Sequence, residues 1–366
     1  MIHILFMPLL QIPSGHHHVA DCIQDQLNEA SEEFHCEKIE LLSYSYGHVE
    51  KLVSSFYLQW IQKFPGLYSN VYQQMAVKQE KHNKHYYIYE LLFLKHVQRM
   101  IAQTKPDLII CTHALPSYLL DRLKKKNLWT GKVLNVYTDY FINDLWGFDH
   151  INYHFIPTIE VQRKLLERGV DQQQTILTGI PVHPLFRTNN HPGTMKEKYT
   201  VLISGGNMGA GSIEKLVDRL RPSGTINYYV LCGKNNKLYQ SIKQRNHSFI
   251  HALPYIHSKD EMNTLYDQAD AIITKPGGVT ISESLWKRLP IFVYEALPGQ
   301  EEMNLNYLNS QGLIFHLDNW NTRIAVESTI IERLKIESAQ LHKNLETYFK
   351  PIEKQNITQI IQKLLI

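Results

Sequence analysis

Short apolar runs rich in Ile, Leu, Val and Tyr alternate along the chain with longer segments of helical periodicity. This alternation is typical of parallel β-sheets covered by helices on both faces, so the fold class predicted is α/β. The strands predicted in the first half are residues 2–7, 38–42, 108–112, 133–137 and 153–157. Those predicted in the second half are residues 200–204, 227–232, 249–253, 271–274, 291–294 and 313–316.

Two domains are predicted, because 366 residues exceed what one hydrophobic core usually organises. Residues 181–198 contain three prolines, Asn189-Asn190 and Gly193, a composition typical of a linker. The predicted organisation is a first domain at 1–182, a linker at 183–198, a second domain at 199–340 and terminal helices at 341–366, with a helix break at Pro351.

The composition, 43% hydrophobic with a net charge of +3, indicates a soluble globular protein. The apolar start IHILFMPLL has no Lys or Arg before Lys38, which favours a buried first strand over a signal peptide. No apolar run is long enough to span a membrane. The four cysteines are scattered without a CxxC pair, which favours a reducing cytoplasm.

The chemistry is densest at residues 272–304, where an apolar run leads into Gly277-Gly278-Val279-Thr280. Thr280 is the predicted N-cap of a helix over 281–288. A glycine turn at a helix N-terminus suits a nucleotide diphosphate, and Glu283, one turn later, is placed to accept hydrogen bonds from ribose hydroxyls. The alternative is that the glycines only close a turn and that Glu283 is a solvated helix residue.

Two further elements extend this donor site. After the strand predicted at 291–294, the amide of Gln300 and the carboxylate of Glu301 are placed to bind hexose hydroxyls. Another glycine loop, Gly205-Gly206-Asn207-Met208-Gly209, precedes a helix predicted from Ser212 and suits a pyrophosphate. Its spacing is not GxGxxG, so a dinucleotide fold ranks below a nucleotide sugar. The ordered set predicts a nucleotide-sugar glycosyltransferase.

Several segments in order resemble glycosyltransferase family 28, which includes plant monogalactosyldiacylglycerol synthase, bacterial processive diacylglycerol glucosyltransferases and, more distantly, the N-acetylglucosaminyltransferase of peptidoglycan synthesis. The segments are Ser14-Gly15-His16, Thr138-Asp139-Tyr140 leading to Trp146, Thr178-Gly179-Ile180-Pro181, Gly205 to Gly209, Cys232-Gly233-Lys234-Asn235, Thr274 to Gly278 and Gly299-Gln300-Glu301. The resemblance implies the GT-B architecture: two Rossmann-like domains with parallel sheets facing across a cleft, and terminal helices crossing back onto the first domain. It also implies that Gly233 lies in the donor site, and that main-chain groups at Tyr255 and Ile256 hold a uracil.

The resemblance places the acceptor and the base in the first domain. An inverting transfer from a UDP-α-sugar needs a base that removes the acceptor proton, and His16 after the first strand suits this role, with Asp139 as the second candidate. Gly15 and Trp146 are assigned to the acceptor side. His16-His17-His18 is the one histidine cluster and favours a single functional His over a metal site. No DxD motif accompanies the donor elements, so no metal is predicted.

Residues 44–105 carry eight Lys and Arg against three Glu, together with 12 aromatic residues that include Tyr57, Trp60 and Phe64. Basic amphipathic helices with aromatics suit an anionic membrane surface. The alternative is an ordinary helical insert with a solvated charged face. Nucleic acid ranks lower, because the basic residues form no dense stripe.

The predicted function is transfer of glucose or galactose from a UDP-sugar to a lipid hydroxyl such as diacylglycerol. The enzyme is expected in the cytoplasm, peripherally bound to the inner face of the cell membrane. Asn143 and His183 depart from the family pattern and leave the acceptor open. The alternatives are a transferase acting on a non-glycerolipid acceptor, a UDP-N-acetylglucosamine 2-epimerase-like enzyme and a catalytically silent nucleotide-sugar sensor.

Overall fold

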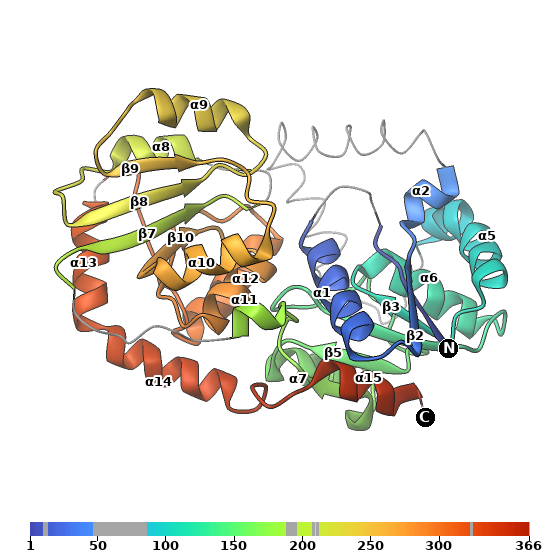
Figure 1. Ribbon diagram of the computed structural model, residues 1–366. Coiled ribbons are helices and arrows are strands. Elements are labelled where there is room, and N and C mark those ends of the chain that lie inside the picture. Colours follow the sequence, from blue (N-terminus) through green and yellow to red (C-terminus); the bar gives the residue numbers. More distant parts are fainter. Residues whose placement is uncertain are drawn as a thin grey trace. The chain divides into compact units, whose positions relative to one another are not determined.

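The computed structural model describes residues 1–9, 14–46, 86–187, 196–206, 209, 212–322 and 325–365. The chain forms two compact units (Figure 1): Met1–Pro181 with Pro351–Ile366, and Val182–Lys350. The predicted site residues Tyr57, Trp60, Phe64, Asn207 and Met208 lie outside the described residues.

The first unit is built on a six-stranded parallel sheet in the order β2-β1-β3-β4-β5-β6. Its strands are β1 (Ile2–Phe6), β2 (Phe34–Lys38), β3 (Leu108–Cys111), β4 (Lys132–Val136), β5 (Tyr153–Ile156) and β6 (Thr175–Leu177). Its helices are α1 (Gly15–Ala30), α2 (Leu41–Tyr46), α5 (Tyr87–Thr104), α6 (Ala114–Lys125), α7 (Ile159–Glu167) and α15 (Ile357–Leu365). The strand order reverses between β1 and β3, where open α/β sheets bind ligands.

The second unit repeats the plan in the order β12-β11-β10-β7-β8-β9, again with parallel pairing throughout. Its strands are β7 (Tyr199–Ser204), β8 (Ile226–Leu231), β9 (Ile250–Leu253), β10 (Ala271–Thr274), β11 (Ile291–Val293) and β12 (Phe315–His316). Its helices are α8 (Ile213–Arg219), α9 (Asn236–Gln244), α10 (Lys259–Gln268), α11 (Gly278–Trp286), α12 (Gln300–Ser310), α13 (Val326–Ile336) and α14 (Ser338–Phe349). Here the order reverses between β7 and β10.

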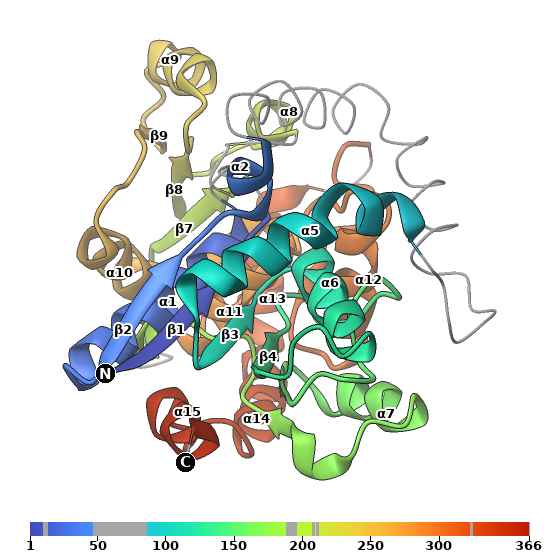
Figure 2. The ribbon, with the colours of Figure 1, turned by 90° about the vertical axis from the view of Figure 1, so that its right-hand side faces the viewer.

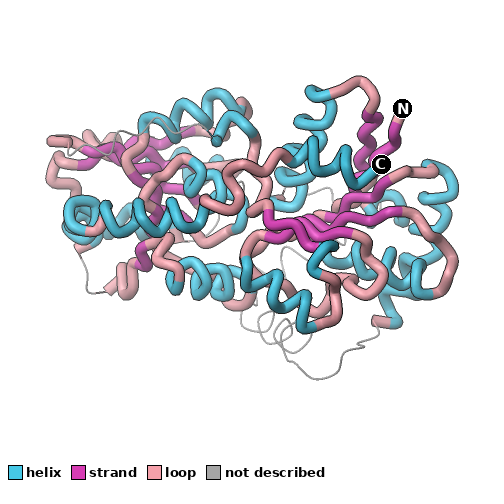
Figure 3. The backbone as a smooth tube through the Cα atoms, turned by 90° about the horizontal axis from the view of Figure 1, so that it is seen from below, coloured by secondary structure: helices cyan, strands magenta, loops and turns pink. Residues whose placement is uncertain are grey.

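Burial explains why these short runs form central strands. All residues of β3 and of β10 are buried, as expected for parallel strands covered on both faces. In each unit the strands form a central layer with helices on either side (Figure 3). The predicted α/β class with two parallel sheets is therefore confirmed.

The last residues return to the first unit. In α15 the Thr358 hydroxyl lies 3.5 Å from the carbonyl oxygen of Gln26 in α1, and Lys132 Nζ donates to the carbonyl oxygen of Leu364 at 2.8 Å. Helix α14, which spans the predicted boundary at residue 341, belongs to the second unit. Part of the predicted linker is also packed: the short 3-10 helix η4 (Pro184–Arg187) buries Phe186 edge-on against Tyr266.

Two predicted boundaries were wrong, and one strand was not predicted. The second strand is β2 at Phe34–Lys38, because the buried pair Leu41 and Leu42 begins α2 and packs into the core. Edge strand β6 was not predicted, and its two apolar residues, Ile176 and Leu177, are only partly buried. Helix α11 begins at Gly278 with Gly277 as N-cap, so Thr280 lies in the first turn and is not the cap. Over the described part of the chain, no helix combines the length and the apolar character needed to cross a membrane.

Candidate functional site

The predicted donor residues gather at one edge of the second sheet. Gly206 follows β7, Gly233 follows β8, Tyr255 follows β9 and Gly277 follows β10. Because β7 to β10 run parallel, these loops share the carboxyl edge of the sheet, and β7 and β10 flank the reversal of strand order.

The N-terminus of α11 is shaped to receive an anion. The amide of Gly277 donates to the Lys275 carbonyl oxygen at 2.8 Å, and the Gly277 carbonyl oxygen accepts from Ile281 N at 3.1 Å. The amides of Gly278, Val279 and Thr280 form the first turn, where a helix offers donors without intrahelical acceptors.

Gly277 itself is not required by the fold. Its φ is −76°, which any residue adopts, and a Cβ added there would meet no heavy atom within 4 Å. The absence of a side chain leaves room for close approach of a ligand to the α11 amides.

Glu283 lies one turn further along α11. Its Oε2 accepts a 2.9 Å hydrogen bond from the Tyr266 hydroxyl. Burial raises the pKa of Glu283 to about 7, against the opposing effects of the Tyr266 hydrogen bond and of Lys259. A carboxylate in this state is stabilised by further hydrogen-bond donors such as a ribose diol.

The loop assigned to the hexose is tied to the loop before α11. Glu301 Oε2 accepts from Leu297 N at 2.7 Å and lies 3.3 Å from Lys275 Nζ. Asn304, buried in the same helix, donates to the Pro276 carbonyl oxygen at 3.0 Å. Gln300, the other predicted hexose residue, is the first residue of α12.

Of the predicted glycine loop after β7, the structure describes Gly205, Gly206 and Gly209. Gly206 has a φ of 73° and Gly209 a φ of 56°, and a Cβ on Gly209 would lie 2.0 Å from the Cys232 carbonyl oxygen. Both the amide and the hydroxyl of Ser212 donate to Glu295, at 3.0 and 2.9 Å. The carboxylate of Glu295 therefore binds the N-cap residue of α8.

The two remaining donor elements are half-buried. Gly233 has a φ of 56°, which favours glycine in the turn after β8. Tyr255, beside Ile256, lies under the ammonium of Lys234 at 5.4 Å from its ring centroid and packs on His257. The loop after β8 and the loop after β9 are therefore in contact.

In the first unit, His16 lies at the start of α1, directly after Gly15. Its Nδ1 lies 2.8 Å from the Thr112 carbonyl oxygen and 2.8 Å from Thr138 Oγ1. Because a carbonyl only accepts, Nδ1 carries a hydrogen, and in the neutral ring Nε2 holds the lone pair. The fold thus selects the tautomer that a general base needs.

Burial favours the neutral form of this imidazole. Burial lowers the pKa of His16 below its ordinary value, while the Asp139 carboxylate and the hydrogen bond to Thr112 act in the opposite direction. The structure therefore brings together the two predicted catalytic residues. The ring of His113 lies edge-on to His16, with 4.8 Å between centroids, and its Nδ1 caps α6 by accepting from Leu115 N.

Trp146, predicted on the acceptor side, is a core residue. It is 7% exposed and packs against Tyr137, with 4.6 Å between ring centroids. Its contribution is to the hydrophobic core of the first unit.

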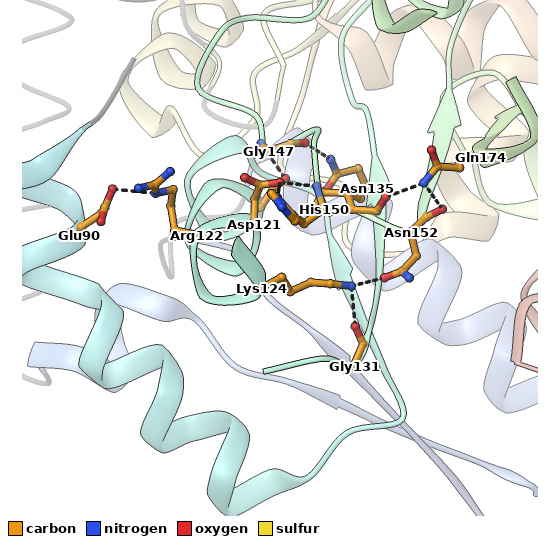
Figure 4. Close-up of polar contacts among 12 residues, drawn as sticks. Glu90, Asp121, Arg122, Lys124, Gly131, Asn135, Gly147, His150, Asn152 and Gln174 are labelled. Atoms are coloured by element: carbon orange, nitrogen blue, oxygen red, sulfur yellow. Dashed lines mark hydrogen bonds and ion pairs between the residues drawn. The ribbon is translucent and has the colours of Figure 1, made fainter. Parts of the chain in front are cut away.

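One group among the described residues has the geometry of a cation site: Asp121, Asp149 and His150 in the first unit. Figure 4 shows Asp121 and His150 side by side. Asp121 already accepts the His150 amide at 2.8 Å, and the Ser117 hydroxyl accepts from the Gly147 amide nearby. These contacts fix the loop before β5. The group belongs to a different unit from the donor residues.

Sequence reasoning missed five residues of these sites. They are Thr112, His113, Tyr266, Lys275 and Asn304. Thr112-His113 was within reach, because it follows β3 as His16 follows β1, and these strands flank the reversal. The contacts of the other three join segments 17 to 28 residues apart, which no local pattern encodes.

Two family models match the chain and together cover most of it. Residues 16–182 match monogalactosyldiacylglycerol (MGDG) synthase. Residues 200–363 match the glycosyltransferase family 28 C-terminal domain.

Solved structures share the fold at low sequence identity. A MurG of Acinetobacter baumannii is 16% identical with a TM-score of 0.59, and the alignment covers 100% of this chain and 99% of that one. A UDP-GlcNAc 2-epimerase of Neisseria meningitidis bound to UDP-GlcNAc is 14% identical with a TM-score of 0.59, covering 100% and 99%. The fold alone therefore does not separate transfer from epimerisation.

Relatives with higher sequence identity say more about function than the solved structures do. An uncharacterized glycosyltransferase, YkoN of Bacillus subtilis (strain 168), is 46% identical over 374 residues, covering 100% of this chain and 98% of the relative. A processive diacylglycerol beta-glucosyltransferase of Bacillus thuringiensis (strain Al Hakam) is 25% identical over 279 residues, covering 73% and 70%. The chain belongs to glycosyltransferase family 28, with a first unit of the monogalactosyldiacylglycerol synthase type, and is a hexosyltransferase.

Proposed function

We propose that the protein transfers glucose or galactose from a UDP-sugar to a lipid hydroxyl such as that of diacylglycerol, with inversion at the anomeric carbon. The observation that carries this proposal is the N-terminus of α11. There, three backbone amides, the open space at Gly277 and the carboxylate of Glu283 follow one another within about two helical turns.

On the donor side, the diphosphate receives hydrogen bonds from the amides of Gly278, Val279 and Thr280. Glu283 accepts from the ribose hydroxyls, and Gln300 with Glu301 binds the hexose. The positive end of the helix dipole stabilises the negative charge that develops on the departing UDP. The proposal therefore needs no divalent cation.

On the acceptor side, Nε2 of His16 takes the proton of the lipid hydroxyl as that oxygen attacks C1 of the sugar. The C1–O bond to the diphosphate breaks, and its electron pair leaves with UDP. Asp139 stabilises the imidazolium that forms, since its charge already raises the pKa of His16. Thr112 and Thr138 hold the ring in place through Nδ1.

Helix α5 offers a surface on which the enzyme can meet its lipid. Ile88, Leu91 and Leu92 are 73%, 84% and 42% exposed, and Lys95 and Arg99 follow at helical spacing along the same side. Exposed apolar residues next to cations suit the interface of an anionic bilayer. We therefore place this protein peripherally on the inner face of the cell membrane.

Glu90, the acidic residue within helix α5, points away from this exposed surface. Glu90 is 8% exposed and binds Arg122 and Lys126 of the α6 segment, both at 2.9 Å, together with the Tyr118 hydroxyl at 2.7 Å. Helices α5 and α6 lie side by side (Figure 2). The buried ion pairs thus fix α5 with its apolar residues outward.

The relative named as a diacylglycerol beta-glucosyltransferase supports the acceptor class. A non-glycerolipid acceptor is the alternative within transfer. Epimerisation is the second candidate function, favoured by the fold shared with the UDP-GlcNAc 2-epimerase. Experiment can distinguish transfer from epimerisation, because an epimerase acts on its nucleotide sugar without an acceptor.

The test is incubation of the purified protein with UDP-glucose or UDP-galactose and vesicles of phosphatidylglycerol containing diacylglycerol, followed by mass spectrometry of the lipids. We expect a hexosyl-diacylglycerol, formed at the same rate with EDTA present. A glycosylated product with another lipid hydroxyl would change the acceptor. Conversion of UDP-N-acetylglucosamine without any lipid would replace transfer by epimerisation.

A further inference from the structure

Lys275 lies between the two loops that the proposed donor site needs. It directly follows β10 and is two residues from the N-cap of α11. Its main-chain carbonyl oxygen accepts from Gly277 N at 2.8 Å and so shapes the turn before the helix. Its side chain points to α12, where the ammonium lies 3.3 Å from Oε2 and 3.4 Å from Oε1 of Glu301.

The pair is protected from water. The Lys275 side chain is 8% exposed and that of Glu301 is 22% exposed. Burying an ammonium is costly unless a charge and hydrogen bonds compensate it, so Lys275 holds the Glu301 carboxylate close to one position. The 2.7 Å hydrogen bond from Leu297 N fixes the same oxygen, Oε2.

The second oxygen of Glu301 is held more loosely. Both oxygens lie at nearly the same distance from the ammonium, 3.3 Å for Oε2 and 3.4 Å for Oε1, and Oε2 also accepts the short bond from Leu297 N. Oε1 is therefore the oxygen best able to accept from a ligand hydroxyl. The bond from Asn304 to the Pro276 carbonyl oxygen ties the first turns of α12 to the same loop.

We propose that Lys275 is a positioning residue for recognition of the donor's hexose: it orients Glu301 and joins the hexose loop to the diphosphate loop. The inference rests on the proposed function and deepens it. Lys275 touches neither the sugar nor the diphosphate in this account. It acts through Glu301, so the part of the affinity that the hexose contributes should depend on Lys275.

The chain offers a matched control. Lys287, at the opposite end of α11, is 0% exposed and pairs with the 21% exposed Asp267 at 2.7 Å. Lys275→Met and Lys287→Met each remove the cation of a buried pair on the same segment. Only the first should alter how the protein distinguishes a nucleotide sugar from its nucleotide.

The experiment is isothermal titration of UDP, UDP-glucose and UDP-galactose into the wild type, Lys275→Met, Lys275→Arg, Glu301→Gln and Lys287→Met. The measured quantity is the ratio of the affinity for the nucleotide sugar to the affinity for UDP. The nucleotide sugar used for every variant is whichever of UDP-glucose and UDP-galactose the wild type binds more tightly. We expect Lys275→Met to lower that ratio about tenfold, the scale of one charge-assisted hydrogen bond, and Lys275→Arg to restore most of it. Lys287→Met should lower the melting temperature and leave the ratio unchanged.

Equal losses of UDP and UDP-sugar affinity in Lys275→Met would overturn the inference. If Lys275→Met does not fold, Glu301→Gln provides the test, because it keeps the shape of the Glu301 side chain. An unchanged affinity ratio in Glu301→Gln would overturn the proposal equally. A wild type that binds neither UDP nor a UDP-sugar would instead refute the proposed donor site, and the role of Lys275 with it.

Discussion

Gly277 and Gly209 look alike in the sequence and play different parts in the structure. The backbone at Gly277 has an ordinary φ and open space beside Cα, whereas Gly209 has a φ of 56° and faces the Cys232 carbonyl oxygen. For the first glycine, the explanation we propose is the close approach of a ligand. The second is explained by the fold alone.

Gly277→Ala should therefore fold with an unchanged melting temperature and bind UDP at least tenfold more weakly, because the added methyl group reaches into the space assigned to the diphosphate. Titration calorimetry together with thermal unfolding measures both properties. As the control, Gly209→Ala should destabilise the protein by roughly 1–3 kcal/mol. Wild-type UDP affinity in Gly277→Ala would remove the diphosphate from this position.

If Glu283 binds the ribose as proposed, donor binding should depend on pH. Its pKa is about 7 in the donor-free protein, and ribose hydroxyls donate only to the ionised form, so binding lowers that pKa. Affinity for UDP-glucose should be greatest above pH 7 and fall as pH decreases from about 7, by at most about tenfold per pH unit. UDP-glucose is the appropriate probe because its diphosphate has no terminal phosphate that titrates in this range.

The matched variant is Glu283→Gln. It should bind UDP-glucose more weakly than the wild type does, and its affinity should stay the same between pH 6 and 8. If it retained the pH dependence of the wild type, another group would be responsible.

The residues that sequence reasoning found carry chemistry that stands out locally, such as a glycine turn followed by a carboxylate. Glu283 and His16 are of this kind. Lys275 and His113 were given no role because the role of each depends on a contact in the folded chain. Lys275 contacts Glu301, and His113 contacts His16. Trp146 was assigned to the acceptor on resemblance, but its size and apolar ring place it in the core.

At the scale of elements, the buried central strands could be predicted, whereas edge strands β2 and β6 and the start of α11 could not. The central strands β3 and β10, with the sequences LIIC and AIIT, are almost wholly apolar, and each was placed within a residue. Strand β2, with the sequence FHCEK, buries only Phe34 fully and so lacks such a run. The start of α11 was misplaced because Gly277 serves as N-cap without a side chain.

Helix α5 should determine attachment to the membrane. Ile88→Ser combined with Leu91→Ser should lower partition into phosphatidylglycerol vesicles at least tenfold, because two exposed apolar side chains no longer enter the interface. Flotation with vesicles measures the bound fraction. Stability should change little, since both positions are exposed.

Ile159→Ser with Leu166→Ser is the matched control on α7, where the side chains are 49% and 39% exposed. This variant should bind vesicles as the wild type does. Equal losses in the two double variants would show that α5 has no special role.

At the scale of the whole molecule, the chain forms two units built on the same plan, and the proposed function divides its tasks between them. The candidate base lies in the unit of Met1–Pro181 with Pro351–Ile366, and the donor residues lie in Val182–Lys350. Apolar periodicity was sufficient to predict two parallel sheets. It could not show that η4 and α14 pack with the second unit, because their few apolar residues acquire partners only in the folded chain.

This division yields the most direct test of the account: UDP release from UDP-glucose or UDP-galactose, measured with and without diacylglycerol in anionic vesicles, for the wild type and for His16→Ala. We expect release only when lipid is present, and a rate 10²–10⁴-fold lower in His16→Ala, the usual contribution of a general base, with UDP affinity unchanged because the donor residues belong to the other unit. Lipid-independent release, or full activity of His16→Ala, would contradict the account.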